Sequence, residues 1–156
     1  MKQISKLEAI LWSIALPGFS QLLMGSYIKG ILFVILEFII NVNSHFNQAI
    51  MYSFLGEMEK AHLVTNYQWL MFYPCVYMFA MWDSFRMAMP AHEKFSFLPF
   101  VFGAYFVTVG LMYSPKLLLF GIYFGPVFLP MIFLIPGLGI GFLIKFIIAS
   151  KSKLGS

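Results

Sequence analysis

Residues 7–26 read LEAILWSIALPGFSQLLMGS, an apolar stretch that is interrupted at its centre by Pro17 and Gly18. A helix of about 20 mostly apolar residues is long enough to span the hydrocarbon core of a bilayer. A Pro-Gly pair, in contrast, ends or kinks a helix. The stretch therefore either crosses a membrane once or turns back toward the side from which it came, and the number of spans depends on which of these it does.

The composition of the whole chain indicates a membrane environment. Of its 156 residues, 61% are hydrophobic and only 10% are charged, whereas a soluble domain carries about 25% charged residues. A domain of this size buries only about 70% of its unfolded surface, so that lipid must cover part of the apolar remainder. Long stretches without a formal charge mark candidate spans, at residues 61–82, 95–115 and 117–144.

The distribution of basic residues decides how the first stretch is placed. If it crossed fully, only four of the ten basic residues would lie inside, namely Lys2, Lys6, Lys60 and Lys116. If it turns back near Pro17 and Gly18, eight of the ten lie inside: Lys2, Lys6, Lys29, Arg86, Lys94, Lys145, Lys151 and Lys153. Loops on the cytoplasmic side carry an excess of lysine and arginine. The pattern therefore favours a hairpin over a crossing.

We expect an all-α integral membrane protein of the cell membrane, with four transmembrane helices and an N-terminal re-entrant or interfacial hairpin, because helices satisfy their own backbone in lipid. Both termini are predicted to be cytoplasmic. Residues 1–156 form a single helical membrane domain in this interpretation. Its predicted parts are the hairpin 7–26, spans at about 28–46, 66–88, 97–114 and 117–135, an outside loop at about 47–65, and an interfacial helix at 142–149.

Two Pro-Gly pairs interrupt apolar segments in similar ways. Pro17-Gly18 is followed by Lys29, and Pro136-Gly137 is followed by Lys145. Paired broken segments point to a binding site at the membrane midplane in transporters. The alternative is that two common Pro-Gly pairs coincide by chance.

The first stretch also resembles a known pattern. Residues 15–30 read ALPGFSQLLMGSYIKG, which is similar to the P-G-x-G-Q-x-Y-x-G-x-x-x-K-G hairpin of small bacterial multi-span membrane proteins, described as two-span-domain-like or permease-N-terminal-like. Residues 81–88, MWDSFRMA, resemble the end of the second span in those proteins. Ser20 and Leu23 depart from the pattern, where glycine and an aromatic residue are usual. The resemblance implies a hairpin fold, and most such proteins have no assigned activity.

Glu37 is the most informative polar residue, because a carboxylate in a span is costly and usually faces protein or water. Asn41 and His45 follow it at helical spacing, which stacks the three side chains on one helix face. They predict a polar track from the middle of the membrane to its outer surface, able to bind a cation, a proton or a lipid headgroup. The alternative is hydrogen bonding between helices, in which such groups act as packing contacts.

Asp83 and Arg86 form the second candidate site. Their spacing of three residues allows them to pair on one helix, and Lys29 begins the neighbouring span at a similar depth. One interpretation is a charge cluster that fixes how the helices pack. The other is an inner gate or a site for lipid phosphate, since arginine suits phosphate.

Other chemistries lack a signature in this sequence. His45, His62 and His92 are predicted on different loops and span ends, and no H-E-x-x-H or C-x-x-C spacing occurs, so that no metal or cofactor is predicted. No G-x-S-x-G sequence occurs either. The net charge of +4 fits attraction to anionic lipids and needs no nucleic acid.

Three functions remain open from the sequence. The first is a small-solute or ion transporter or a channel subunit, acting as a homo-oligomer because four spans hardly enclose a path. The second is an accessory or regulatory subunit that binds a larger membrane protein. The third is an enzyme acting on a lipid or lipid-linked substrate, although its acidic and basic groups are predicted on opposite leaflets. The absence of catalytic motifs favours a protein that is not an enzyme.

Overall fold

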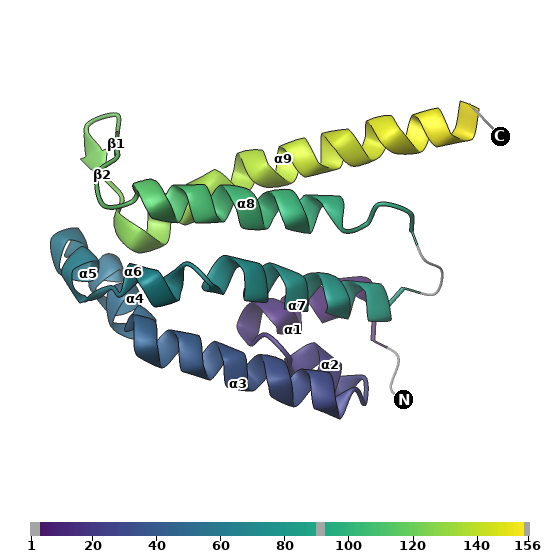
Figure 1. Ribbon diagram of the computed structural model, residues 1–156, viewed down its shortest axis with the longest axis horizontal. Coiled ribbons are helices and arrows are strands. Elements are labelled where there is room, and N and C mark those ends of the chain that lie inside the picture. Colours follow the sequence, from purple (N-terminus) through teal and green to yellow (C-terminus); the bar gives the residue numbers. More distant parts are fainter. Residues whose placement is uncertain (1–3, 90–92, 155–156) are drawn as a thin grey trace.

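Long helices lying side by side dominate the fold (Figure 1). The computed structural model describes residues 4–89 and 93–154. In this part of the chain, the bundle consists of α3 (Tyr27–Ser44), α7 (Tyr73–Met87), α8 (Leu98–Tyr113) and α9 (Gly125–Leu154). Helix α7 lies in the middle and contacts α1, α2 and α3 on one side and α8 on the other. The protein is therefore mostly helical, as the sequence predicts.

The N-terminal stretch is a helical hairpin. Helix α1 (Lys6–Ala15) begins at Ser5, whose hydroxyl accepts a hydrogen bond from the Glu8 amide at 3.1 Å. It ends at Leu16, and the short helix α2 (Phe19–Leu23) follows after Pro17 and Gly18. Gly18 has a φ of 98°, a conformation that glycine adopts without steric cost. The chain therefore folds back within residues 7–26, and α3 starts at the same end of the bundle as α1 (Figure 1).

Short helices occupy residues 46–70, most of which were expected to be a loop. They are α4 (Phe46–Phe54), α5 (Met58–Val64) and α6 (Tyr67–Leu70), and they lie at the end of the bundle opposite to both termini (Figure 1). The predicted span 66–88 is divided between α6 and α7, with a turn at Met71 and Phe72. Pro74 stands in the first turn of α7, where its missing amide hydrogen costs least and its ring would clash with a helix continuing from before it.

The helix at the position of the fourth predicted span, α9, starts later and ends later than expected. Residues 117–124 are not helical: β1 (Leu118–Leu119) and β2 (Ile122–Tyr123) pair as an antiparallel hairpin, with Leu118 opposite Tyr123 and Leu119 opposite Ile122. Phe120 and Gly121 form its tip with φ of 53° and 78°, the two positive φ angles that a type I′ turn requires. The prediction of a helix from residue 117 was wrong, because a short apolar run has the same appearance in a strand and in a buried helix.

Helix α9 is continuous from Gly125 to Leu154, with Pro130 and Pro136 inside it. The predicted interfacial helix at 142–149 is therefore the last part of α9 and not a separate element. Pro136 and Gly137 do not break the helix, whereas Pro17 and Gly18 form a turn. The two Pro-Gly pairs are thus different structures, and the similarity between them in the sequence does not extend to the fold.

Glycines allow α8 and α9 to approach closely. A Cβ atom on Gly141 would lie 2.5 Å from the Cα of Pro99, and one on Gly137 would lie 2.8 Å from the carbonyl oxygen of Phe102. Across the same contact, a Cβ on Gly110 would lie 2.9 Å from the Cα of Pro130. Small residues at helix contacts let backbones pack tightly in membrane proteins. Gly137 and Gly141 are therefore packing positions of α9 against α8.

Apolar side chains face outward along the bundle. The exposed fraction reaches 87% for Ile28, 69% for Phe38 and 72% for both Ile135 and Phe146. Two helices of the described residues, α3 and the Gly125–Lys151 part of α9, are long and apolar enough to cross a membrane by length and composition, and α8 is a shorter apolar helix. An exposed apolar surface of this extent indicates contact with other proteins or with lipid.

We predict that Gly141→Ala destabilises the protein while Gly139→Ala does not. The Cβ of the first variant meets the backbone of α8, whereas nothing lies within 4 Å of a Cβ on Gly139. Overpacking costs about 1–3 kcal/mol, and alanine in place of a helical glycine is otherwise favourable by about 0.5–1 kcal/mol. Thermal unfolding in detergent measures both variants. Equal unfolding temperatures for the two would show that the α8–α9 contact is looser than described.

Candidate functional site

Glu37 lies on α3 beside α7, half-buried between the two helices. The Tyr73 hydroxyl donates a hydrogen bond to its Oε1 atom at 3.0 Å, and the Tyr73 ring stacks on Tyr77 with 5.4 Å between the ring centroids. Among the described residues, no lysine, arginine or histidine forms an ion pair with Glu37. In the part of the chain that the structure describes, the carboxylate therefore has a neutral hydrogen-bond donor and no ion-pair partner.

The structure does not continue the predicted polar track to His45. Asn41 lies on α3 one turn after Glu37, but its side chain binds the next segment: its Nδ2 donates to Asn47 Oδ1 at 3.2 Å and its Oδ1 accepts from the Asn47 amide at 3.3 Å. His45 has a φ of 57°, follows the last residue of α3, and is exposed. Asn41 therefore holds the α3–α4 turn, and His45 lies off the helix face because the helix has already ended.

Asp83 is the centre of a second polar cluster. Its Oδ1 accepts a hydrogen bond from Lys29 Nζ at 2.7 Å, and its Oδ2 accepts one from Gln21 Nε2 at 3.3 Å. The same Gln21 nitrogen donates to the Ala80 carbonyl at 2.8 Å. The Asp83 side chain is only 11% exposed, and that of Lys29 is 52% exposed. This cluster connects the N-terminal hairpin, α3 and α7 through one carboxylate.

The predicted pairing of Asp83 with Arg86 is not the one observed. Arg86 lies over the Trp82 ring, with its guanidinium carbon 5.4 Å from the ring centroid, and no carboxylate of the described residues pairs with it. Asp83 faces the hairpin and α3, where Lys29 and Gln21 reach it. The spacing of three residues permits a contact on one helix, but partners on neighbouring helices determine which contact forms.

Buried serines extend this contact between the hairpin and α7. The Ser20 hydroxyl donates to the Ala9 carbonyl at 2.6 Å, and the Ser84 hydroxyl donates to the same carbonyl at 3.3 Å. Ser13 donates to Ser20 at 3.1 Å. Neither these serines nor Gln21 was among the predicted site residues. The sequence contains an indication of this contact, since Ser13, Ser20 and Gln21 are polar residues around Pro17 and Gly18 in an otherwise apolar stretch.

The residues that carry the family resemblance meet in this cluster. A Cβ on Gly18 would lie 2.4 Å from the Gly30 carbonyl oxygen, and one on Gly30 would lie 2.9 Å from the Gly18 carbonyl oxygen. Two glycines thus let the turn of the hairpin lie directly on the start of α3. Next to them, Lys29 and Gln21 bind Asp83. In this chain, the residues of the pattern hold the hairpin against α3 and α7.

We predict that Gln21→Leu destabilises the fold by roughly 1–3 kcal/mol, because a buried carboxylate and a buried carbonyl lose their shared donor. The matched control is Gln48→Leu, which removes an exposed amide from α4. Unfolding of both purified variants in detergent, followed by circular dichroism, measures the difference. A stability of Gln21→Leu equal to that of the control would contradict the role given to this cluster.

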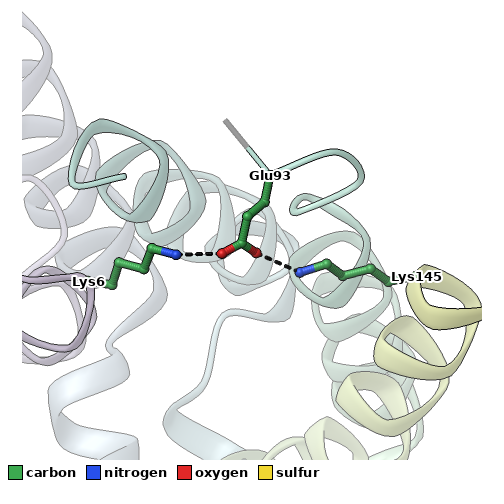
Figure 2. A network of polar contacts seen from close by, with 3 residues as sticks. All are labelled: Lys6, Glu93 and Lys145. Atoms are coloured by element: carbon green, nitrogen blue, oxygen red, sulfur yellow. Dashed lines mark hydrogen bonds and ion pairs between the residues drawn. The ribbon is translucent and has the colours of Figure 1, made fainter. Parts of the chain in front are cut away.

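Glu93 links the two ends of the chain. Its carboxylate accepts hydrogen bonds from Lys6 of α1 and, at 3.0 Å, from Lys145 of α9 (Figure 2). The Lys6 ammonium also lies 5.5 Å from the centroid of the Phe85 ring. Hydrogen bonds from Lys6 and Lys145 hold the pKa of the Glu93 carboxyl below its ordinary value. This bridge was not foreseen from the sequence.

We predict that the Glu93 bridge makes stability depend on acid pH. Because the pKa is lower in the folded protein, the bridge stabilises the fold above the ordinary carboxyl value of 4.5 and loses this effect as the pH falls through the folded value. Between pH 7 and a pH below the folded pKa of Glu93, the free energy of unfolding of the wild type should therefore decrease more than that of Glu93→Gln. Equal losses in thermal unfolding experiments would show that the bridge contributes nothing in solution.

Two cavities flank α7. An open groove of about 650 Å³ lies between α3 and α7 and has Lys29 and Asp83 at one end of an otherwise apolar lining of Leu32, Phe33, Leu36, Cys75, Val76 and Phe79. A smaller pocket of about 170 Å³ lies at the end of α7 near Glu93. Glu37 lines neither of them. Within the described residues, no group of three His, Cys, Asp or Glu side chains is placed to hold a metal ion, and His92 lies outside those residues.

No protein-family model, curated protein or solved structure matches this chain.

Proposed function

We propose that this chain is a four-span membrane protein in which α3, α6–α7, α8 and α9 cross the bilayer and the α1–α2 hairpin dips in from the cytoplasmic side. The arrangement of charges supports this orientation. The first turns of α1 and α3, which carry Lys6 and Lys29, and the last turn of α7, which carries Arg86, lie at the end of the bundle where both termini lie (Figure 1). Lys94 precedes α8 at this end, and Lys145 of α9 donates a hydrogen bond to Glu93 there. Helix α5, which carries Lys60, and the end of α8, which Lys116 follows, lie at the other end (Figure 1). Basic residues gather on the cytoplasmic side of membrane proteins. Exposed apolar side chains cover the helices between the two ends.

Labelling of single cysteines tests the orientation. In a Cys75→Ala background, Glu59→Cys should react with a membrane-impermeant maleimide on intact cells, because Glu59 is exposed on α5 at the proposed outer end. Ser150→Cys, near the end of α9, should react only after the cells are permeabilised. Labelling of Ser150→Cys on intact cells would overturn the proposed orientation.

Within this orientation, the protein acts as an accessory subunit that binds a larger membrane protein through the α3–α7 surface around Glu37. One observation carries this proposal: the Glu37 carboxylate is half-buried in an apolar surface, has one hydrogen bond from Tyr73, and lacks an ion-pair partner among the described residues. Ionisable side chains in spans usually pair with each other or face a polar cavity. A cationic side chain on a helix of the partner would form the ion pair that Glu37 lacks.

The chain itself offers no such cation at this depth. Lys29 precedes Glu37 by eight residues on α3, about 12 Å along the helix axis, and the sequence contains no lysine or arginine in residues 61–85 or 117–144. A second copy in the same orientation would place its basic residues at the two ends of the bundle, and not at the depth of Glu37. The best partner is therefore a different membrane protein that carries lysine or arginine in the middle of a span.

The transporter hypothesis has less support from the fold. One of its sequence arguments was the pair of broken segments, and α9 is continuous through Pro136 and Gly137. The polar track also stops at Asn41, since His45 lies off the helix. Glu37 remains compatible with proton or cation binding in an oligomer. Transport is therefore the alternative function that the experiment below must distinguish from the accessory role.

We predict that Glu37→Gln releases the protein from its assembly. Extracted from native membranes in mild detergent, the wild type should occur in a complex whose mass by native mass spectrometry is not a multiple of the 17.9 kDa chain. Loss of one partner of a buried charge pair costs about 2–5 kcal/mol, so that the recovered complex should fall at least about tenfold. Glu59→Gln, which removes an exposed charge from α5, should leave it unchanged.

Two results would contradict an accessory role that depends on Glu37. A complex that survives Glu37→Gln would show that another surface binds the partner. A complex with the mass of two or more copies of this chain alone would favour a homo-oligomer. In that case, proton or cation flux into liposomes that requires Glu37 would support the transport function instead.

A further inference from the structure

A small pocket at the cytoplasmic end of α7 combines hydrogen-bond donors with aromatic walls. It has a volume of about 170 Å³ and lies between the last turns of α7 and the segment that leads into α8. Trp82 and Arg86 line it from α7, and Ser96 lines it from the other side, together with the rings of Phe95 and Phe97. None of the interactions that hold the hairpin on α3 and α7 uses these side chains.

Two of the side chains that line this pocket, Trp82 and Arg86, have donors without a partner among the described residues. The Trp82 Nε1 atom is buried, and no described residue accepts a hydrogen bond from it. A buried donor without an acceptor costs about 1–3 kcal/mol, and such exceptions often mark an absent ion or ligand. Arg86 pairs with no carboxylate of the described residues, while its guanidinium is held over the Trp82 ring. Ser96 is only 6% exposed and adds a hydroxyl.

The charge balance around the pocket is positive. Among the described residues that line the pocket, Glu93 is the one carboxylate. This group is already shared between Lys6 and Lys145 (Figure 2). The positive charges of Arg86, Lys6 and Lys145 therefore exceed the single negative charge of Glu93. The lining favours an anion that accepts several hydrogen bonds over a cation or a neutral apolar ligand.

We propose that this pocket binds a phosphate group, with Arg86 as its main ligand and Trp82 Nε1 and Ser96 as further donors. The planar guanidinium presents its donors in a fork that matches phosphate oxygens, and an indole nitrogen can only donate. A volume of about 170 Å³ accommodates the phosphate and its first ester carbons, while longer chains would have to leave through the open side.

The phosphate can come from a lipid headgroup or from a soluble phosphate. The lipid source rests on the proposed orientation, in which the end of α7 lies at the headgroup level of the cytoplasmic leaflet. The soluble source does not depend on it. Binding of phosphate at Arg86 is also independent of Glu37, which lies on α3 beside the other end of α7.

The experiment measures binding to the purified full-length chain in detergent by native mass spectrometry and by thermal shift. The probes are phosphatidic acid, phosphatidylglycerol, phosphatidylcholine and inorganic phosphate. For a lipid site, the two anionic phospholipids should bind at least about tenfold more tightly to wild type than to Arg86→Gln, a loss expected for a charged hydrogen-bonded pair. For a soluble ligand, inorganic phosphate should show this dependence on Arg86, and the phospholipids should not.

Matched variants separate the pocket from general surface charge. Lys94→Gln removes the same charge from an exposed position in the same segment and should change binding less than about threefold. Trp82→Phe retains the ring but removes the donor, and Ser96→Ala removes the hydroxyl; each should weaken binding by several fold. These two variants keep the test valid if Arg86→Gln does not fold.

Three outcomes would overturn the proposal: equal losses in Arg86→Gln and Lys94→Gln, full binding in both Trp82→Phe and Ser96→Ala, or no binding of any phosphate probe to wild type. The Glu37→Gln variant should bind phosphate like wild type. Failure of the proposed assembly and failure of this pocket are therefore distinguishable in the same set of proteins.

Discussion

The carboxylate of Asp83 is the point at which the N-terminal hairpin, α3 and α7 meet. Lys29 supplies a positive charge and Gln21 supplies an amide donor, and both come from segments that are distant from Asp83 in the sequence. A buried carboxylate that lacks its partners is costly. The hairpin therefore has one favourable position on the bundle, with its turn against the start of α3, where Gly18 and Gly30 allow the backbones to touch.

The second half of the bundle is held together in a different way. Helices α8 and α9 pack through glycines, and the closest approaches involve backbone atoms of Leu98, Pro99 and Phe102. Van der Waals packing of this kind is an important driving force where lipid replaces water, since the hydrophobic effect does not distinguish a neighbouring helix from an acyl chain. Polar contacts join the two halves at both ends. Glu93 bridges α1 and α9 through Lys6 and Lys145 at one end (Figure 2), and the Ser114 hydroxyl donates to the Tyr67 hydroxyl at 3.4 Å at the other.

Several polar groups of the described residues lack a complete set of partners. The buried atoms Gln21 Oε1, Ser53 Oγ, Trp82 Nε1 and Tyr123 Oη have no hydrogen-bond partner there. Two groups, Glu37 on α3 and Trp82 on α7, carry the binding proposals. Glu37 has a hydrogen bond from Tyr73 and no cation among the described residues, and Trp82 Nε1 has no acceptor there. Both lie where apolar surroundings make an unmet polar group expensive. The binding roles proposed for them are contact with a helix of another membrane protein for Glu37, and phosphate binding for the Trp82–Arg86 pocket.

Local chemistry alone determined the helical class, the turn at Pro17 and Gly18, and the separation of basic residues between the two ends, because each follows from residue type and spacing. The contact of Lys29 with Asp83 could also be anticipated, since antiparallel neighbours place their ends at a similar depth. The tertiary structure decided the rest. Whether Asp83 pairs with Arg86 or with Gln21 depends on how α7 is rotated against its neighbours, and whether residues 117–124 form a helix or a β-hairpin cannot be read from an apolar run that suits both.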